Sequence, residues 1–233
     1  QPSNIYYNNF SVFIFLIIII LFIFFSGERA NFIRSFICLI IFLSLYQGLK
    51  LKYKFLFSLV FIALLSIVFL KSEYLKHRYI TQFASVISNP DKFVNIKSFK
   101  LYSDIYRSGL LVFKNYPIFG VGNKNYRIET CDEQAKEIIY ICITHPHQIY
   151  IEFLSEHGLF GSTILLSILF YLIFRLLKPI LQSRNYLQLG CIIYLIQTFL
   201  PILPSGAFFH DFNLTIFCIN FSLMYAANKQ TNI

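Results

Sequence analysis

The residues best suited to chemistry gather in one short segment, residues 144–161, which reads Thr-His-Pro-His-Gln-Ile-Tyr-Ile-Glu-Phe-Leu-Ser-Glu-His-Gly-Leu-Phe-Gly. The segment joins a long polar loop to a long apolar run, so its histidines and its two glutamates lie at the edge of a predicted membrane span. Titratable groups at that depth are costly and tend to mark function. Because histidine is well suited to take a proton near neutral pH, the segment predicts acid–base chemistry at a membrane surface.

Two histidines of this segment compete for the role of the base. Pro146 disfavours helical backbone at His145, so His147 is better placed, at the start of the following helix and with a fixed direction. His145 is then a supporting residue. The alternative, a histidine that only caps a helix or fills a polar pocket, stays open.

Glu152 and Glu156 are four residues apart and therefore share one helix face. Two carboxylates on one face resemble the pair of a glycosidase, but buried carboxylates also serve structural roles. For Glu152 we favour the structural role. Glu156 lies deeper, and for it a structural and a supporting role in the site are equally open.

The elements that must position these residues are membrane spans. The chain is 57% hydrophobic with 28 Phe, and several runs are too long and too apolar for the core of a soluble protein of this size. We predict an all-α integral membrane protein with about six transmembrane helices, and, since the first residue is Gln1, a fragment of a longer chain. The predicted spans are residues 10–25, 32–48, 55–70, 149–177, 186–203 and 208–227. Gly158 and Gly161 are expected to divide the fourth span into a short entry helix and the span proper.

Basic residues between the spans predict the orientation. The formal net charge of +9 comes from residues between apolar runs, which indicates topology and an anionic lipid substrate rather than nucleic acid. If the spans alternate, the basic clusters share one side, which the positive-inside rule makes cytoplasmic. They are Lys50, Lys52 and Lys54, then Arg175, Lys178 and Arg184, then Lys229. The chain thus divides into three spans (1–70), one long periplasmic loop (71–147) and three further spans (148–233).

The long loop has structure of its own. Residues 93–116 predict an amphipathic helix that lies on the membrane surface, and the turn 117–122, Pro-Ile-Phe-Gly-Val-Gly, follows it. An oxidising compartment permits a disulfide between Cys131 and Cys142. A metal site made of these cysteines and the two histidines is a weaker alternative, because the spacing fits no common zinc pattern.

Two arginines outside the spans are candidate anion ligands. Arg29 follows Ser-Gly-Glu in a tight connection, and Arg107 lies on the loop helix. A guanidinium binds phosphate through two parallel hydrogen bonds. The alternatives are a surface pair of Arg29 with Glu28 and a solvated face for Arg107. Near the last span, His210 and Asp211 are expected to satisfy each other.

The order of these motifs resembles that of the bacterial O-antigen ligase and polymerase family. Its signature His-Pro-His-Asn-x-Tyr-Leu-x-x-x-x-Glu-x-Gly-x-x-Gly is similar to residues 145–161, with Gln148 in place of the usual Asn. A Ser-Gly-x-Arg-like motif and a loop arginine before Pro-x-x-Gly-x-Gly complete the match. The resemblance implies that His147 is catalytic, that Arg29 and Arg107 bind a diphosphate, and that Glu156 and Gln148 support the site.

The resemblance also implies the substrates and the place of the reaction. The donor is an undecaprenyl-diphosphate-linked saccharide, and the acceptor is lipid A-core or a lipid-linked glycan. The site faces the periplasm from the inner membrane, among membrane lipids. We find no phosphate-binding or dinucleotide loop and no Asp-x-Asp pair, so we expect neither cofactor nor metal. The alternatives are a transporter of lipid-linked saccharide that performs no chemistry and a non-catalytic scaffold.

Overall fold

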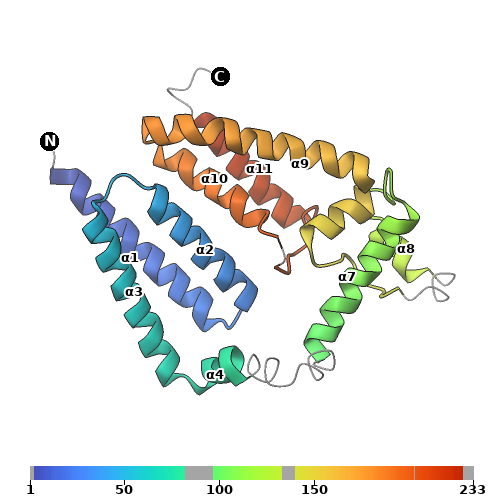
Figure 1. Ribbon diagram of the computed structural model, residues 1–233, viewed down its shortest axis with the longest axis horizontal. Helices are drawn as coiled ribbons and strands as arrows, with labels where there is room; N and C mark the ends of the chain where they lie inside the picture. The colour runs from blue at the N-terminus through green and yellow to red at the C-terminus, as the bar shows by residue number, and fades with distance from the viewer. Residues whose placement is uncertain (1–2, 82–96, 133–139, 202, 228–233) are drawn as a thin grey trace. The chain divides into compact units, whose positions relative to one another are not determined.

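The computed structural model describes residues 3–81, 97–132, 140–201 and 203–227, and in these residues the regular structure is helical throughout (Figure 1). The side chains of residues 3–10 and 97–99 are not described. The chain forms two compact units, residues 1–92 and 93–233, and each is treated by itself.

The first unit consists of three long apolar helices and a short helical end. They are α1 (Ser3–Phe25), α2 (Arg29–Leu45), α3 (Leu51–Lys71), α4 (Glu73–Lys76) and the π-helix η1 (His77–Thr81). The α1 ring of Phe13 packs against Tyr46, with ring centroids 5.9 Å apart, and against Phe57 of α3 at 4.9 Å. Other phenylalanines, such as Phe22 and Phe55, stay largely exposed, as expected of surfaces that face lipid rather than water.

The second unit holds the loop helices and three further apolar helices: α7 (Lys97–Asn115), α8 (Tyr126–Cys131), α9 (Ile149–Ser183), α10 (Tyr186–Thr198) and α11 (Asp211–Ala226). α7 packs on the beginning of α9, and α10 packs on both α9 and α11. Between α10 and α11 the buried side chains include Ile192, Leu195 and Met224. A polar bond accompanies them, because Gln188 Nε2 donates to the Met224 carbonyl at 2.9 Å.

Each of the six predicted spans coincides with a helix. By length and composition, α3 and α9 are apolar and long enough to cross a membrane, and shorter apolar stretches cover Ser11–Phe25 and Tyr186–Thr198. Six membrane crossings and a periplasmic loop therefore stay predictions. The loop helix predicted at 93–116 is α7, and its first predicted residues, 93–96, lie outside the described part.

The span boundaries predicted on either side of the α10–α11 connection are wrong. The fifth span was expected to reach residue 203, but α10 ends at Thr198, and the sixth begins at Asp211 rather than at residue 208. Pro201 and Pro204 explain the shorter helix, because proline lacks the backbone donor and disfavours helix in the residue before it. The non-helical segment between α10 and α11 turns out to line the site.

Candidate active site

The His-Pro-His segment ends two residues before α9. His147 has φ 54, in the left-handed region, and Gln148 is the N-cap, whose Oε1 accepts from the Ile151 backbone N at 2.8 Å. The expectation that His147 starts the helix is therefore wrong. The backbone of His147 is held instead by a hydrogen bond from outside the helix: its carbonyl accepts from the Ser205 backbone N at 2.8 Å. Gln148 caps α9, which its longer side chain still allows, and its supporting role in the site stays a prediction.

The two histidines lie against each other. The ring centroids of His145 and His147 are 4.0 Å apart, and the Tyr102 ring of α7 meets His147 edge-on at 6.1 Å. His145 Nδ1 shares a 2.9 Å hydrogen bond with Thr144 Oγ1. Burial and then the neighbouring His147 lower the pKa of His145 to about 4, so this ring is neutral at pH 7. Within the described residues the His147 imidazole has no hydrogen-bond partner, which leaves it available to a substrate.

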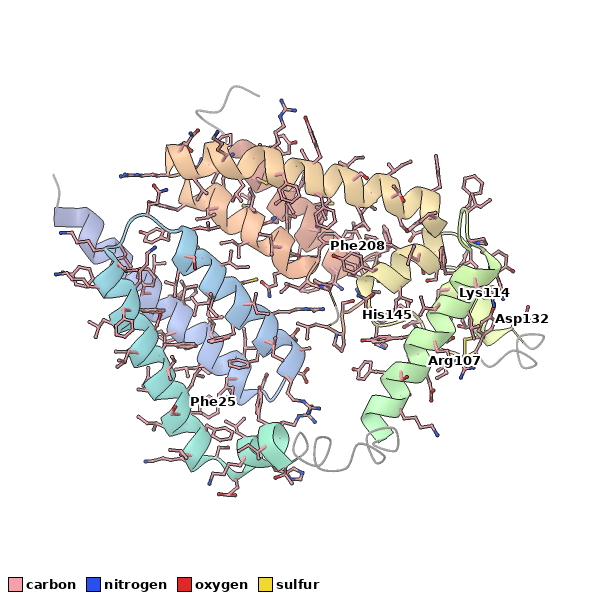
Figure 2. All side chains as sticks on the ribbon, in the orientation of Figure 1. Phe25, Arg107, Lys114, Asp132, His145 and Phe208 are labelled. Carbon is pink, nitrogen blue, oxygen red and sulfur yellow. A yellow bond between two sulfur atoms is a disulfide. The ribbon has the colours of Figure 1, made fainter. Side chains whose placement is uncertain are left out.

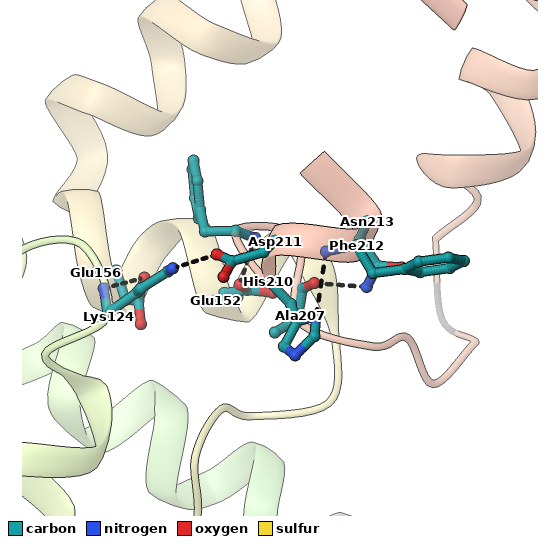
Figure 3. Close-up of polar contacts among 9 residues, drawn as sticks. Lys124, Glu152, Glu156, Ala207, His210, Asp211, Phe212 and Asn213 are labelled. Carbon is teal, nitrogen blue, oxygen red and sulfur yellow. Dashed lines mark hydrogen bonds and ion pairs between the residues drawn. The ribbon is translucent and has the colours of Figure 1, made fainter. Parts of the chain in front are cut away.

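Both glutamates are buried, and both accept hydrogen bonds from backbone N–H groups (Figure 3). The two carboxylate oxygens of Glu152 lie 2.9 and 3.0 Å from the Phe208 N. Glu156 Oε2 accepts from the Lys124 N at 3.0 Å. Each carboxylate thus ties a different loop to α9, a geometry that fits structural groups rather than a glycosidase pair.

The expected mutual pair of His210 and Asp211 is wrong. The Asp211 carboxylate binds Lys124 Nζ at 2.9 Å, whereas His210 Nδ1 accepts from the Phe212 N at 3.4 Å as the N-cap of α11 (Figure 3). The N-cap bond engages His210 Nδ1 with its own helix, and no hydrogen bond or ion pair joins His210 to Asp211 among the described residues. Because Lys124 and Asp211 are exposed, their pair contributes little to stability.

The turn 117–122 is bonded to a break in α9. Gly158, with φ 62 and ψ −170, interrupts the helix and frees backbone groups on both sides. The loop takes up these groups through four hydrogen bonds. They are Val121 N to Ser155 O (3.0 Å), Gly122 N to Glu156 O (2.8 Å), Leu159 N to Pro117 O (2.8 Å) and Phe160 N to Ile118 O (3.1 Å).

Glycine is required on both sides of this contact. A Cβ on Gly158 would collide with the Ile118 carbonyl, and one on Gly120, which has φ 68, would collide with the backbone of Glu156. The Pro-x-x-Gly-x-Gly and Glu-x-Gly-x-x-Gly motifs lie more than 30 residues apart in the sequence and form one contact between the loop and α9. We call this contact the loop joint.

Arg107 lies on α7 beside the surface that packs on the histidine segment (Figure 2). Ser108 and Gly109 are buried there, and a Cβ on Gly109 would meet Pro146 and Ile151. Arg107 itself is exposed, and in the described part of this unit its guanidinium makes no hydrogen bond or ion pair. Among the described residues, no hydrogen bond, ion pair or ring contact joins Arg107 to either histidine, so its guanidinium is accessible to an anion from outside the protein.

The sequence pattern of the O-antigen ligase family matches residues 14–166, well over half of the chain. The match includes both halves of the loop joint and both histidines. This chain belongs to the O-antigen ligase family. Neither the search of curated proteins nor that of solved structures found a match.

Membership places the protein among the membrane enzymes of O-antigen assembly, whose reaction is glycosyl transfer of the ligase and polymerase type. The expectation from the motif order is thereby confirmed at the level of the family. The roles of individual residues are not settled by membership.

In the first unit of this O-antigen ligase family member, Arg29 is the first residue of α2 and is half-buried. It forms no ion pair with Glu28 within the described residues, so the alternative of a surface pair between these two residues is not found. The turn before it is held from η1, because Arg78 Nε donates to the Gly27 carbonyl at 3.2 Å. Burial raises the pKa of Tyr79, and the Arg29 and Arg78 charges oppose that rise, so both guanidiniums lie near this phenol.

A disulfide joins Cys131 and Cys142. With both sulfurs bonded to each other, the alternative metal site loses two of its four proposed ligands. The bridge joins the end of α8 to the residue after Ile141. A polar contact lies beside it, in which Ser108 Oγ accepts from Tyr126 Oη and from the Ile141 N, both at 3.1 Å. The disulfide therefore steadies the chain that leads into the histidine segment.

Three contributors were missed from the sequence. Ser205 holds His147, Lys124 holds Glu156, and Arg78 holds the turn before Arg29. Ser205 and Lys124 act through backbone groups, for which a sequence carries little signal. Arg78 had a visible signal, the basic run Lys-His-Arg at 76–78, which was treated as part of the loop.

Proposed function

We propose that this protein transfers a glycosyl group from an undecaprenyl-diphosphate-linked saccharide to a hydroxyl acceptor in O-antigen or surface-polysaccharide assembly. In a ligase the acceptor is lipid A-core, and in a polymerase it is another lipid-linked saccharide. The observation that carries the proposal is a His147 imidazole without a protein partner among the described residues, held beside a neutral histidine in a chain of the O-antigen ligase family.

The proposed reaction is a displacement with inversion at the anomeric carbon. His147 takes the proton of the acceptor hydroxyl, whose oxygen forms the new glycosidic bond. The old bond between the anomeric carbon and the phosphate oxygen breaks, and its electron pair leaves with the diphosphate. Cations placed where this charge develops supply the stabilisation, so the proposal needs neither a metal ion nor a cofactor.

Arg29 and Arg107 are the proposed ligands of the diphosphate. Replacing either by alanine should weaken donor binding by roughly ten- to a hundredfold, because a lost charged hydrogen bond typically costs about 1.5–3 kcal/mol. Lysine should restore binding only in part, since it keeps the positive charge but cannot form the two parallel hydrogen bonds of a guanidinium. The measurement is binding of the lipid-linked donor to purified variants.

Arg175→Ala is the matched control, because this exposed arginine lies far along α9, where it contacts Tyr171. Equal binding by all of these variants would refute the assignment.

The orientation of the site is also a proposal, and it rests on the basic clusters. A reporter active only outside the cytoplasm should be active when fused near Lys97 and silent near Lys52 or Arg184. The reverse pattern would place the histidine segment in the cytoplasm, away from the proposed donor.

The function itself is tested by analysing surface glycans in a deletion strain. Loss of full-length chains from lipid A-core indicates a ligase, and a single repeat on the core indicates a polymerase. Unchanged glycans contradict the proposal. Lipid-linked saccharide trapped on the cytoplasmic side would indicate a transporter instead.

A further inference from the structure

The return segment, residues 203–210, folds back from α10 onto the histidine segment. Its Ser205 N donates to the His147 carbonyl, and its Phe208 N binds the buried Glu152 carboxylate. Two hydrogen-bonded anchors, one just before α9 and one in its first turn, thus hold this stretch against the candidate base. The return segment is therefore a wall of the site, although none of its residues was singled out for chemistry beyond His210.

Two side-chain atoms at this contact have no partner. His145 Nε2 and Ser205 Oγ are both buried and meet no hydrogen-bond partner among the described residues, although the Ser205 backbone lies close enough to the His145 ring to oppose the fall in its pKa. Both belong to residues in direct contact with His147, one through ring packing at 4.0 Å and the other through the 2.8 Å backbone bond. Other buried atoms of the described residues, such as His157 Nε2 and Ser162 Oγ, also lack a partner, so what distinguishes this pair is that both atoms lie together beside a candidate catalytic group.

The chemistry of the two atoms selects the kind of ligand. The other nitrogen of His145 bonds to Thr144, so Nε2 either only accepts or only donates, according to the tautomer. The Ser205 hydroxyl can take the complementary role in either case. A group that donates one hydrogen bond and accepts another therefore matches both atoms. A sugar hydroxyl does so, whereas an ionised phosphate or carboxylate only accepts. The lowered pKa of His145, caused first by burial, agrees with a neutral partner.

We infer that His145 and Ser205 bind a hydroxyl group of the acceptor saccharide and hold it next to His147. The inference rests on the proposed glycosyl transfer and adds an acceptor subsite to it. His145 and Ser205 are then positioning residues, and the return segment helps to decide which acceptors are used.

The test is steady-state transfer by the purified full-length chain, with the lipid-linked saccharide as donor and with lipid A-core and lipid-linked saccharide as parallel acceptors. Ser205→Ala should raise the acceptor KM about five- to tenfold, the usual loss for one neutral hydrogen bond, and leave the donor KM unchanged. Ser205→Thr should restore most of the affinity. The double variant with His145→Ala should lose less than the product of the two single losses, because both residues hold the same hydroxyl.

Ser183→Ala is the matched control, because that hydroxyl only bonds to its own helix at the Ile180 carbonyl, 3.2 Å away. If the wild type transfers saccharide while Ser205→Ala keeps the normal acceptor KM, the subsite is wrong and the proposed function stands. If donor and acceptor KM rise together, the serine serves the fold and the subsite is again wrong. If the wild type transfers nothing to either acceptor, the proposed function fails and the subsite with it.

Discussion

Replacing His147 by alanine should lower glycosyl transfer at least a hundredfold, which is the lower end of what a positioned general base contributes. Donor binding should stay nearly normal, because in the proposed mechanism the imidazole acts on the acceptor hydroxyl and the arginines hold the diphosphate. His145→Ala should be milder, since that ring only positions the acceptor. Transfer and donor binding are to be measured in parallel on the same purified preparations.

The matched control is His77→Ala, because this exposed histidine begins η1 in the first unit and is not part of the proposed machinery. A His147→Ala protein that transfers normally would remove the proposed mechanism. Family membership would stand, and the transporter would become the leading hypothesis.

Replacing Gly158 by alanine should cost the second unit about 3 kcal/mol or more. Its φ of 62 and ψ of −170 lie in a region nearly exclusive to glycine, where another residue pays about 1–3 kcal/mol, and the new Cβ also collides with the Ile118 carbonyl. The variant should unfold at a clearly lower temperature and lose transfer, because the loop joint supports the start of α9. Thermal unfolding of the purified protein in detergent measures this.

Gly190 provides the matched control for this substitution. It lies in the middle of α10, and a Cβ there would meet nothing within 4 Å. Gly190→Ala should be neutral or slightly stabilising, since alanine is the better helix former. Equal unfolding temperatures for Gly158→Ala and the wild type would show that the break in α9 is not held by the loop.

Local patterns in the sequence were sufficient to locate the helices. Runs of Phe, Ile and Leu predicted each long apolar helix, and Gly158 predicted the division of α9. The errors at α10 and α11 came from giving hydropathy more weight than Pro201 and Pro204, whose effect on the backbone is also local. Whether all six helices cross a membrane depends on their surroundings, which no local pattern contains.

The site was predictable in its residues but not in its geometry. The left-handed backbone of His147 depends on a bond from Ser205, and the partner of Asp211 is Lys124, 87 residues away in the sequence. Backbone donors such as the Phe208 N leave no trace in residue types. The motifs contain Gly120 and Gly158, but they also contain Gly161, at which α9 is not broken, and the four bonds that distinguish these glycines required the structure.

The loop joint at Gly158 also bears on the order in which the parts of the second unit can assemble. As a straight helix, the 35 residues of α9 would measure about 52 Å, far beyond a hydrocarbon core of about 30 Å. Residues 117–122 are synthesised before α9, so their four bonds to that helix can form only after it emerges. We therefore expect these four bonds, and with them the support of the break at Gly158, to form only after α9 has been made. The histidine segment is completed later still, because the Ser205 N that binds the His147 carbonyl lies beyond α10 in the chain.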